Sequence, residues 1–454
     1  MLAEIFVIPG LEILRRHHPS IDPILISVGK LDSSSWQSAE LAIRTDQPEA
    51  DEHLIRRLAT LEMGLYAAPA YLERRGMPQT GTGLAGHELI MYPRNILPRR
   101  WEAVCGEEIT GARIALKVTS PLMQRAERRL AEREGRAVRI LAESDYLLGV
   151  ADETRLGALR FRRVGDEVFQ APTHIGVPTL IELGRLLQIT ERILRDEETD
   201  EDLQLIFAPG SSLGGARPKA SVIDQHGHLA ITKFPKETDD YSVETWEEIA
   251  LRLASQAGIA TPLHELVNVG GKPVLLLLRF DRNDKIRIPF LSAMAMMGAK
   301  DDERGSYPEM VDALAQYGAQ GKADAHALYR RVVFNVLISN VDDHLRNHGF
   351  LWLGKAGWSL SPAYDLNPVP TDLKARVLTT NIDLDEGTCS LDLLESASGF
   401  FALTLPQARM IIKDVATVTA KWRDMAKAVG ARSAEINRMA SAFEHNDLKR
   451  ALAL

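Results

Sequence analysis

The chain has 454 residues, of which 45% are hydrophobic and 26% are charged, a composition typical of a folded globular protein and not of a disordered one. Its formal net charge of −8 argues against binding of nucleic acid over the whole surface. The two cysteines, Cys105 and Cys389, lie far apart and have no companion ligands at metal spacing, so neither a disulfide framework nor a zinc module is indicated.

The N-terminal sequence, MLAEIFVIPGLEIL, lacks the basic region and the long apolar core of a secretion signal. No window approaches the roughly 20 uncharged apolar residues that a membrane helix needs. We therefore expect a soluble, cytoplasmic protein that has no membrane partner.

The first predicted domain, residues 1–123, has a mixed α/β pattern. We expect short strands at residues 24–28, 39–45 and 64–68 and a short helix at residues 53–61. The next stretch, QRAERRLAEREGRAVR, contains six arginines and three glutamates with opposite charges at helical spacing. We interpret it as a solvated helix rather than a nucleic-acid contact, and we place the domain boundary there.

From residue 144 onward the pattern indicates one continuous enzyme. Strand-like segments come first and helices dominate later, which predicts a first lobe over residues 124–290 and a second, mainly helical lobe over 291–454, with a cleft between them. The expected elements are helices at 177–196, 244–256, 307–317, 325–339 and a set within 405–454, and strands at 221–224, 228–234 and 272–280.

The most informative segment is NVDDHLRNHGFLW (340–352), which follows an apolar helix. Phosphoryl transfer needs a carboxylate that orients the attacking hydroxyl and an amide or carboxylate that holds Mg²⁺. Protein kinases place these groups as Asp-x-x-x-x-Asn in one loop, and Asp342 and Asn347 have that spacing. A second metal-binding carboxylate should follow in a later turn, and LSPAYDLNP (360–368) supplies Asp365.

Two other interpretations of this segment remain open. The polar side chains could simply cap a helix or shape a turn. Alternatively, a metallohydrolase site could be built from four side chains, although no HExxH frame supports it. These four are Asp342, Asp343, His344 and His348.

The Gly/Ser-rich loop GSSLGGARPKAS (210–221) is a candidate phosphate-binding loop. Glycines allow backbone N–H groups to turn toward an anion, and Lys219 or Arg217 could add positive charge. The loop is not a Walker A motif, because Ala216 and Arg217 replace the Lys-Ser/Thr pair. A mobile surface loop is the alternative interpretation.

The strand LAITKFP (229–235) places Lys233 where a kinase lysine would reach the ATP phosphates. Its expected partner is a glutamate on the following helix, for which Glu247 and Glu248 are both available. The apolar strand VLLLLRF (274–280) could form the hinge between the lobes and present backbone groups to adenine.

Several motifs in order resemble those of the HipA family of serine/threonine kinases, the toxin partners of small helix-turn-helix antitoxins. The resemblance runs from about Pro121 to the C-terminus. The matching segments are SDYLLGVADETRLGALRF (144–161), SSLGGARPKA (211–220), ITKFP (231–235), LLRFDR (277–282), NVDDHLRNHGF (340–350) and LSPAYDLNP (360–368).

The resemblance implies an α+β, two-lobed protein-kinase-like fold that uses ATP and Mg²⁺. Asp342 would be the catalytic carboxylate, and Asn347 and Asp365 would bind the metal. Ser212 falls where family members autophosphorylate. The implied ATP-binding residues are Lys233 at the phosphates, Leu278 and Phe280 at adenine, Asp281 at the ribose, and Gly214, Gly215 and Lys219 in the phosphate loop.

Residues 1–120 resemble part of the effector-binding domain of LysR-type regulators, in the place where HipA proteins usually have a small β-rich subdomain. The segments that carry the likeness are LEILRRHHPSI (11–21), AELAIRT (39–45), GLYAAPAYLERRGMPQT (64–80) and LAGHELI (84–90), and it continues more faintly through GARIALKVTSPLM (111–123). The family's helix-turn-helix region is absent, so we expect no direct DNA binding by this chain. Two interpretations of this segment remain open: it could form a ligand-sensing pocket, or it could be a retained fragment that binds nothing.

The sequence thus predicts an ATP- and Mg²⁺-dependent serine/threonine kinase of HipA toxin type. Its substrate would be a protein, for which the family suggests a translation component, and a small antitoxin is the expected partner. The alternative is a catalytically silent, kinase-like regulatory module.

Overall fold

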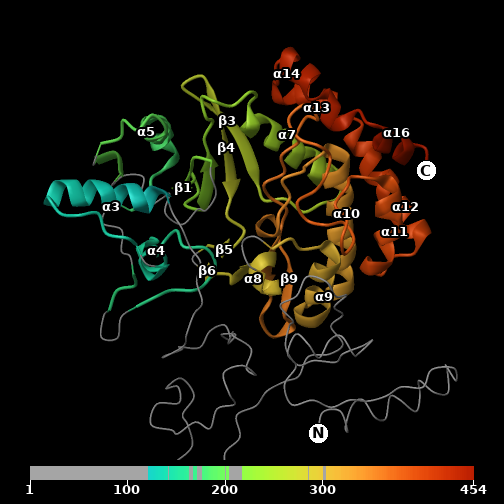
Figure 1. Cartoon of the computed structure of the whole chain (residues 1–454), viewed down its shortest axis with the longest axis horizontal. Helices are drawn as coiled ribbons and strands as arrows, with labels where there is room; N and C mark the ends of the chain where they lie inside the picture. The colour runs from blue at the N-terminus through green and yellow to red at the C-terminus, as the bar shows by residue number, and fades with distance from the viewer. Residues whose placement is uncertain are drawn as a thin grey trace, which may run out of the picture. The chain divides into compact units, whose positions relative to one another are not determined.

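The computed structural model describes residues 121–141, 143–162, 167–170, 176–199, 201–203, 217–284, 286–299 and 303–454 (Figure 1). Contacts divide the chain into Met1–Ala115 and Leu116–Leu454, and every described residue belongs to the second unit. The elements predicted before residue 121 and the phosphate loop up to residue 216 lie outside the described residues. Among those that are described, no helix is long and apolar enough to cross a membrane.

The N-lobe contains a four-stranded antiparallel sheet of strand order β1-β2-β4-β3. Its strands are β1 (Lys219–Ile223), β2 (Leu229–Lys233), β3 (His264–Val269) and β4 (Lys272–Leu278). The predicted strands at 221–224, 228–234 and 272–280 correspond to β1, β2 and β4, and β3 had not been predicted. A turn over Asp224–Gly227 joins β1 to β2, with a hydrogen bond from Gly227 N to Asp224 O of 3.1 Å.

Both faces of this sheet are covered by a helix, which explains why β4 is apolar from Pro273 to Leu278. Val274 and Leu276 pack in a cluster with Leu183, Leu186 and Leu187 of α5 (Leu183–Leu194). The alternate residues Leu275 and Leu277 pack in the other cluster, with α7 (Val243–Gln256). Successive side chains of a strand point to opposite faces, so one continuous apolar strand fills two separate cores.

The C-lobe is mainly helical and is built around α10 (Gly321–Ile338), whose last eleven residues are all buried except Arg330. A three-stranded sheet of order β7-β8-β9 lies beside it, made of β7 (Phe290–Ser292), β8 (Gly349–Trp352) and β9 (Trp358–Leu360). The other helices of this lobe are α8 (Ala293–Met297), α9 (Tyr307–Tyr317), α11 (Leu391–Ala397), α12 (Leu405–Thr419), α13 (Trp422–Val429), α14 (Ser433–Arg438), α15 (Ala440–Phe443) and α16 (Asn446–Leu452).

Helix α7 belongs to both lobes. Figure 1 shows it between the N-lobe strands and the C-lobe helices, and one hydrophobic cluster joins its residues to β4 and to the C-lobe. On the C-lobe side, the Trp246 ring lies 6.2 Å from that of Trp422, which in turn stacks on Phe443 at 4.6 Å. The two lobes are therefore connected through a shared apolar core as well as through the backbone after β4.

Upstream of the sheet, α3 (Pro121–Glu134) and α4 (Glu143–Gly149) complete the described helices of the N-lobe, together with the 3-10 turn Leu180–Glu182 that precedes α5. The arginine-rich run does form a helix, and the carboxylates around it pair with its arginines. Arg125 bonds to Asp196, and Arg136 lies 2.7 Å from Glu127. The α+β fold class with a mainly helical second lobe, expected from the sequence, is confirmed.

The central position of α10 gives a stability prediction. Leu337 is 0% exposed, so Leu337→Ala removes buried methyl groups and leaves a cavity, which costs about 2–5 kcal/mol. We expect the midpoint of urea unfolding, followed by tryptophan fluorescence, to fall accordingly. Met410 on α12 is 61% exposed, and Met410→Ala should change stability by about 0.5 kcal/mol or less. Equal losses for the two variants would contradict this account of the core.

Candidate functional site

Lys233 lies at the centre of a cluster of charges between the lobes. Its Nζ atom is 2.7 Å from both carboxylate oxygens of Glu247 on α7 and 2.6 Å from Oδ1 of Asp365. Lys233 is only 8% exposed and Glu247 only 1%. The structure thus brings together two residues that the sequence marked as separate parts of an ATP site, Lys233 and Asp365.

The strand register places a second lysine beside this cluster. Lys219 is directly opposite Lys233 in the β1–β2 pair, and Leu275 is opposite Lys233 on β4. Residues directly opposite each other in an antiparallel pair share a face, so both lysines lie on the side that α7 covers. Two cations therefore face two carboxylates.

Burial and these neighbours act on the pKa of each group. Burial would lower the pKa of Lys233, but Asp365 and Glu247 raise it above its ordinary value. For Asp365, burial acts in the opposite direction, yet Lys233 and Lys219 hold the pKa of its carboxyl well below the usual range. Burial raises the pKa of Glu247 and lowers that of Lys219. Lys233 and Asp365 are consequently both charged at neutral pH.

The structure also shows which of the two candidate glutamates pairs with Lys233. Glu247 points at Lys233, and its Oε1 additionally accepts the Asp365 backbone N–H at 3.1 Å. Glu248 instead bonds to Arg252 at 2.6 Å and to His264 at 2.7 Å. Adjacent helix positions point about 100° apart, so only one of the two can face the lysine.

Asp365 lies in a turn with a left-handed backbone, at a φ of 59°. Aspartate is one of the few non-glycine residues that adopt this conformation readily. The turn is held by the Asp365 N–H bond to Glu247 and by a bond from Asn367 Nδ2 to Asp365 Oδ1 of 3.2 Å. Within the described residues no group donates to the other oxygen, Oδ2, which leaves it available to a cation.

The loop after α10 carries the other two predicted catalytic residues. Asp342 is exposed, with 62% of its side chain accessible, and its Oδ1 lies 3.3 Å from Nζ of Lys374. Asn347 is 7% exposed, and its Nδ2 donates to the backbone oxygen of Asp342 at 3.1 Å. The amide oxygen of Asn347 takes no part in that bond.

Asp343, one position further, has a different environment. It is 2% exposed, and its Oδ2 accepts bonds from Tyr307, from Asn335 at 2.7 Å and from His348 at 2.9 Å. These contacts account for Asp343 and His348 as buried structural groups. Among the described residues, no set of three or more His, Cys, Asp or Glu side chains could hold a metal ion.

The donor set fits magnesium bound together with phosphates. Mg²⁺ prefers oxygen ligands and is usually held by one or two protein oxygens while phosphates and water supply the rest. Asn347 Oδ1 and Asp365 Oδ2 are oxygens with no hydrogen-bond donor among the described residues. They are the atoms that would hold the ion.

The predicted hinge residues differ in what they can offer to adenine. The N–H of Leu278 already donates to Leu263 O at 2.8 Å. No described residue bonds to the backbone of Phe280, whose ring lies 5.7 Å from that of Tyr364, the neighbour of Asp365. Of the two, Phe280 is therefore the one with a free backbone.

Asp281 is buried and already engaged. Its carboxylate accepts bonds from Arg279 at 2.6 Å, from the Gly157 N–H at 2.7 Å and from Arg282 at 2.9 Å. Asp281 thereby ties the strand end to the segment around Gly157, and its contact with ribose stays a prediction. The other predicted phosphate-loop residues, Ser212, Gly214 and Gly215, lie outside the described residues. Arg217 pairs with Asp239 and Glu244.

Sequence reasoning did not assign roles to Lys374, to Asn335, Asn340 and Asn367, or to Tyr307. A signal was present for Asn335, because a lone amide within the apolar run VVFNVLIS is expected to be buried with a hydrogen-bond partner. Lys374 carried no comparable signal. Its position beside Asp342 depends on the path of the loop that follows Pro370.

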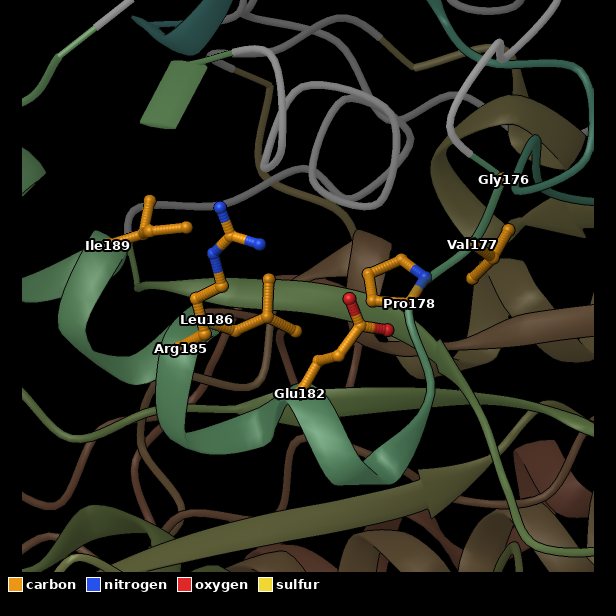
Figure 2. Close-up of a pocket in the computed structure, with 7 residues that line it drawn as sticks. All are labelled: Gly176, Val177, Pro178, Glu182, Arg185, Leu186 and Ile189. Carbon is orange, nitrogen blue, oxygen red and sulfur yellow. The ribbon is translucent and has the colours of Figure 1, made fainter. Parts of the chain in front are cut away.

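A small pocket lies elsewhere, beside α5. Figure 2 shows Glu182, Arg185, Leu186 and Ile189 on one side and the segment Gly176–Pro178 on the other. This segment is attached to the edge of the sheet through a bond from Ile223 N to Pro178 O of 2.8 Å. None of the residues that line the pocket belongs to the predicted site.

The buried charges give a prediction about stability and pH. Lys233→Met leaves Glu247 buried beside Asp365 without the cation, which should cost roughly 3–5 kcal/mol near neutral pH. Because a third of the Asp365 side chain is exposed, most of this cost comes from Glu247. Without the lysine, the folded-state pKa of Glu247 rises further above the unfolded value of about 4.3, so the deficit is small below about pH 4 and grows as pH rises.

Urea unfolding between pH 4 and pH 8 measures this deficit. Lys272→Met is the matched control. Lys272 lies on the same sheet as Lys233 and pairs with Glu191 of α5 at 2.7 Å, but its side chain is 39% exposed. It should cost about 1 kcal/mol or less. A Lys233→Met deficit that does not change with pH would contradict the charge assignment.

Comparison with known proteins gives two family matches. Residues 211–423 match the HipA-like C-terminal domain, and residues 1–132 match the LysR substrate binding domain. A Haemophilus influenzae protein named "Putative kinase" is 24% identical over 211 residues, which cover 40% of this chain and 61% of that protein. The chain therefore spans about three fifths of the length of this curated relative.

Two solved structures are also similar, each with a TM-score of 0.43 over 53% of this chain. One is HipA of Shewanella oneidensis in a complex with HipB and operator DNA, at 19% identity and with 63% of that chain covered. The other is the proinflammatory kinase CtkA of Helicobacter pylori, at 15% identity and with 93% covered. Both resemblances expected from the sequence are confirmed by the family matches: residues 211–423 match the HipA-like C-terminal domain, and residues 1–132 match the LysR substrate binding domain.

Proposed function

We propose that this chain is an ATP- and Mg²⁺-dependent serine/threonine protein kinase of HipA type. The observation that carries the proposal is the contact of Lys233 with both Glu247 and Asp365. A lysine held by a helix glutamate and facing a metal-binding aspartate is the arrangement that kinases use at the ATP phosphates. The HipA-like match over residues 211–423 includes all three residues and supports the same assignment.

In the proposed reaction, Asp342 accepts a hydrogen bond from the substrate serine or threonine hydroxyl. The hydroxyl oxygen attacks the γ-phosphorus, the bond from that phosphorus to the bridging oxygen breaks, and ADP leaves. The hydroxyl proton passes to the Asp342 carboxylate. Bound magnesium would offset the phosphate charge, with Asn347 and Asp365 as its ligands. The exposure of Asp342 suits a group that meets a protein substrate.

The remaining assignments belong to the same proposal. Lys219 and the loop with Gly214 and Gly215 contact phosphate, Phe280 and Leu278 contact adenine, and Asp281 approaches the ribose. The target is a protein, with a translation component as the class that the family suggests, and a small helix-turn-helix antitoxin is the proposed partner in the cytoplasm. Ser212 is the proposed site of autophosphorylation.

Asp342→Asn tests the catalytic carboxylate. The amide keeps the shape of the side chain but cannot take the proton, so we expect phosphoryl transfer to fall by about 10²–10⁴-fold. ATP binding should stay close to that of the wild type, because Asp342 is neither a phosphate contact nor a metal ligand. Label transfer from γ-labelled ATP and calorimetric ATP binding measure the two quantities.

The control is Asp372→Asn, an exposed carboxylate on the segment that also carries Lys374. It should leave both quantities unchanged. Near-normal transfer by Asp342→Asn would remove Asp342 from the mechanism.

Ser212→Ala separates an active kinase from a silent kinase-like module. We expect the purified wild-type chain to incorporate label from γ-labelled ATP with Mg²⁺, and Ser212→Ala to lose that label because it lacks the acceptor hydroxyl. Mass spectrometry of the labelled chain identifies the modified residue. Good nucleotide binding with no label in the wild type would favour the silent module, and label on another residue would exclude Ser212.

A further inference from the structure

Three asparagines form a continuous hydrogen-bonded connection between the loop after α10 and the turn that carries Asp365. Asn340 Nδ2 donates to Asn335 Oδ1 at 3.1 Å, and Asn340 Oδ1 accepts the backbone N–H of Asn367 at 3.2 Å. Asn367 Nδ2 then donates to Asp365 Oδ1 at 3.2 Å. We call Asn335, Asn340 and Asn367 the amide chain.

The amide chain ends on a carboxylate at each side. Asn335 donates its own Nδ2 to Asp343 at 2.7 Å, and Asp343 lies in the loop between Asp342 and Asn347. At the other end Asp365 is bonded to Lys233. Asp365 is thus hydrogen-bonded to this network directly, whereas Asn347 is linked to it through the backbone of the loop that also carries Asp343.

Asn335 and Asn340 can each be oriented in only one way within this network. Asn335 uses its donor on Asp343 and presents its oxygen to Asn340, and Asn340 uses its donor on Asn335 and presents its oxygen to Asn367. Rotation of either amide by 180° would place a donor against a donor or an oxygen against an oxygen. Asp343 therefore fixes the orientation of Asn335 and Asn340, and the Asn367 amide is oriented by its own bond to Asp365 Oδ1.

Burial makes this orientation consequential. Asn335 and Asn340 are both 0% exposed, so water cannot replace a lost partner and an unpaired amide would be costly. The amide chain connects two turns, and each turn contains one residue with a left-handed backbone. These residues are Ser339, with a φ of 55°, and Asp365, with a φ of 59°. A further hydrogen bond, from Val369 N to Ser339 O at 3.1 Å, joins the same two segments as the amide chain.

We propose that Asn340 is a positioning residue that holds the Asn347 loop and the Asp365 turn at the separation needed to bind one Mg²⁺ with ATP. This rests on the proposed kinase function. Asn340 acts through Asn367, which bonds to Asp365 Oδ1 and leaves Oδ2 to the ion. Groups behind metal ligands typically change metal affinity or activity by 10–100-fold when they are removed.

Two variants test this assignment in the full chain. Asn340→Asp keeps the shape of the side chain but removes the donor to Asn335. Asn367→Ala removes only the last link, the donor to Asp365, while its backbone N–H still bonds to Asn340. Asn367 is partly exposed, so this variant should fold even if a buried carboxylate at position 340 does not.

The readouts are calorimetric ATP binding at a series of Mg²⁺ concentrations and the rate of label transfer under the same conditions. For both variants we expect the Mg²⁺ concentration at half-maximal binding to rise about 10–100-fold and transfer at low Mg²⁺ to fall by a similar factor. High Mg²⁺ should restore most of the binding. A purely structural role would lower the melting temperature without changing the Mg²⁺ dependence.

Thr419→Val is the matched control. Thr419 is 0% exposed and its hydroxyl donates to Val415 O at 2.9 Å within α12, so the variant also loses one buried hydrogen bond in the C-lobe. Its Mg²⁺ dependence should equal that of the wild type. If Asn367→Ala also matches the wild type, the amide chain has no positioning role and the proposed function still stands. A wild-type chain that neither binds ATP with Mg²⁺ nor transfers label would overturn both.

Discussion

A buried ammonium group between two carboxylates requires that three separate parts of the chain stay in place. Lys233 comes from β2, Glu247 from α7 and Asp365 from the turn after β9, and each would be left with uncompensated charge if another moved. Such a contact is a poor source of net stability, because desolvation offsets most of the attraction. What it supplies is a defined relative position for the sheet, the helix and the turn, and the rest of the site is arranged around that position.

The apolar core explains how α7 can meet this requirement. One side of the helix packs on Leu275 and Leu277 of β4, and the opposite side packs on the aromatic residues of the C-lobe. The polar part of the helix is then left to face the lysines and Asp365. Packing thus fixes the helix orientation, and the orientation determines that Glu247, and not Glu248, reaches Lys233.

Much of this arrangement could be predicted from the sequence, because local patterns carry it. The apolar run of β4 indicated a strand, and the Asp-x-x-x-x-Asn spacing drew attention to the loop with Asp342 and Asn347. The choice between Glu247 and Glu248 could not be made, since it depends on the rotation of α7 against distant residues. The role of Asp281 was equally beyond reach, because its partners include Gly157, more than a hundred positions away. The hydrogen bond between Asn340 and Asn367 could not be predicted either, because it joins two loops that are distant in the sequence and no local pattern indicates their contact.

The stack of Trp422 on Phe443 behind Trp246 has a consequence for how the lobes can move. In a hinge with a single connection, the N-lobe would tilt as one body over the C-lobe. Here the helix that carries Glu247 is anchored to the C-terminal helices, so an opening motion would have to slide the strands across α7 while the helix stays behind. Removal of α13 to α16 would free that anchor. Helices α13 to α16 supply none of the site residues described above, yet through Trp422 and Phe443 they support the helix that presents Glu247 to Lys233.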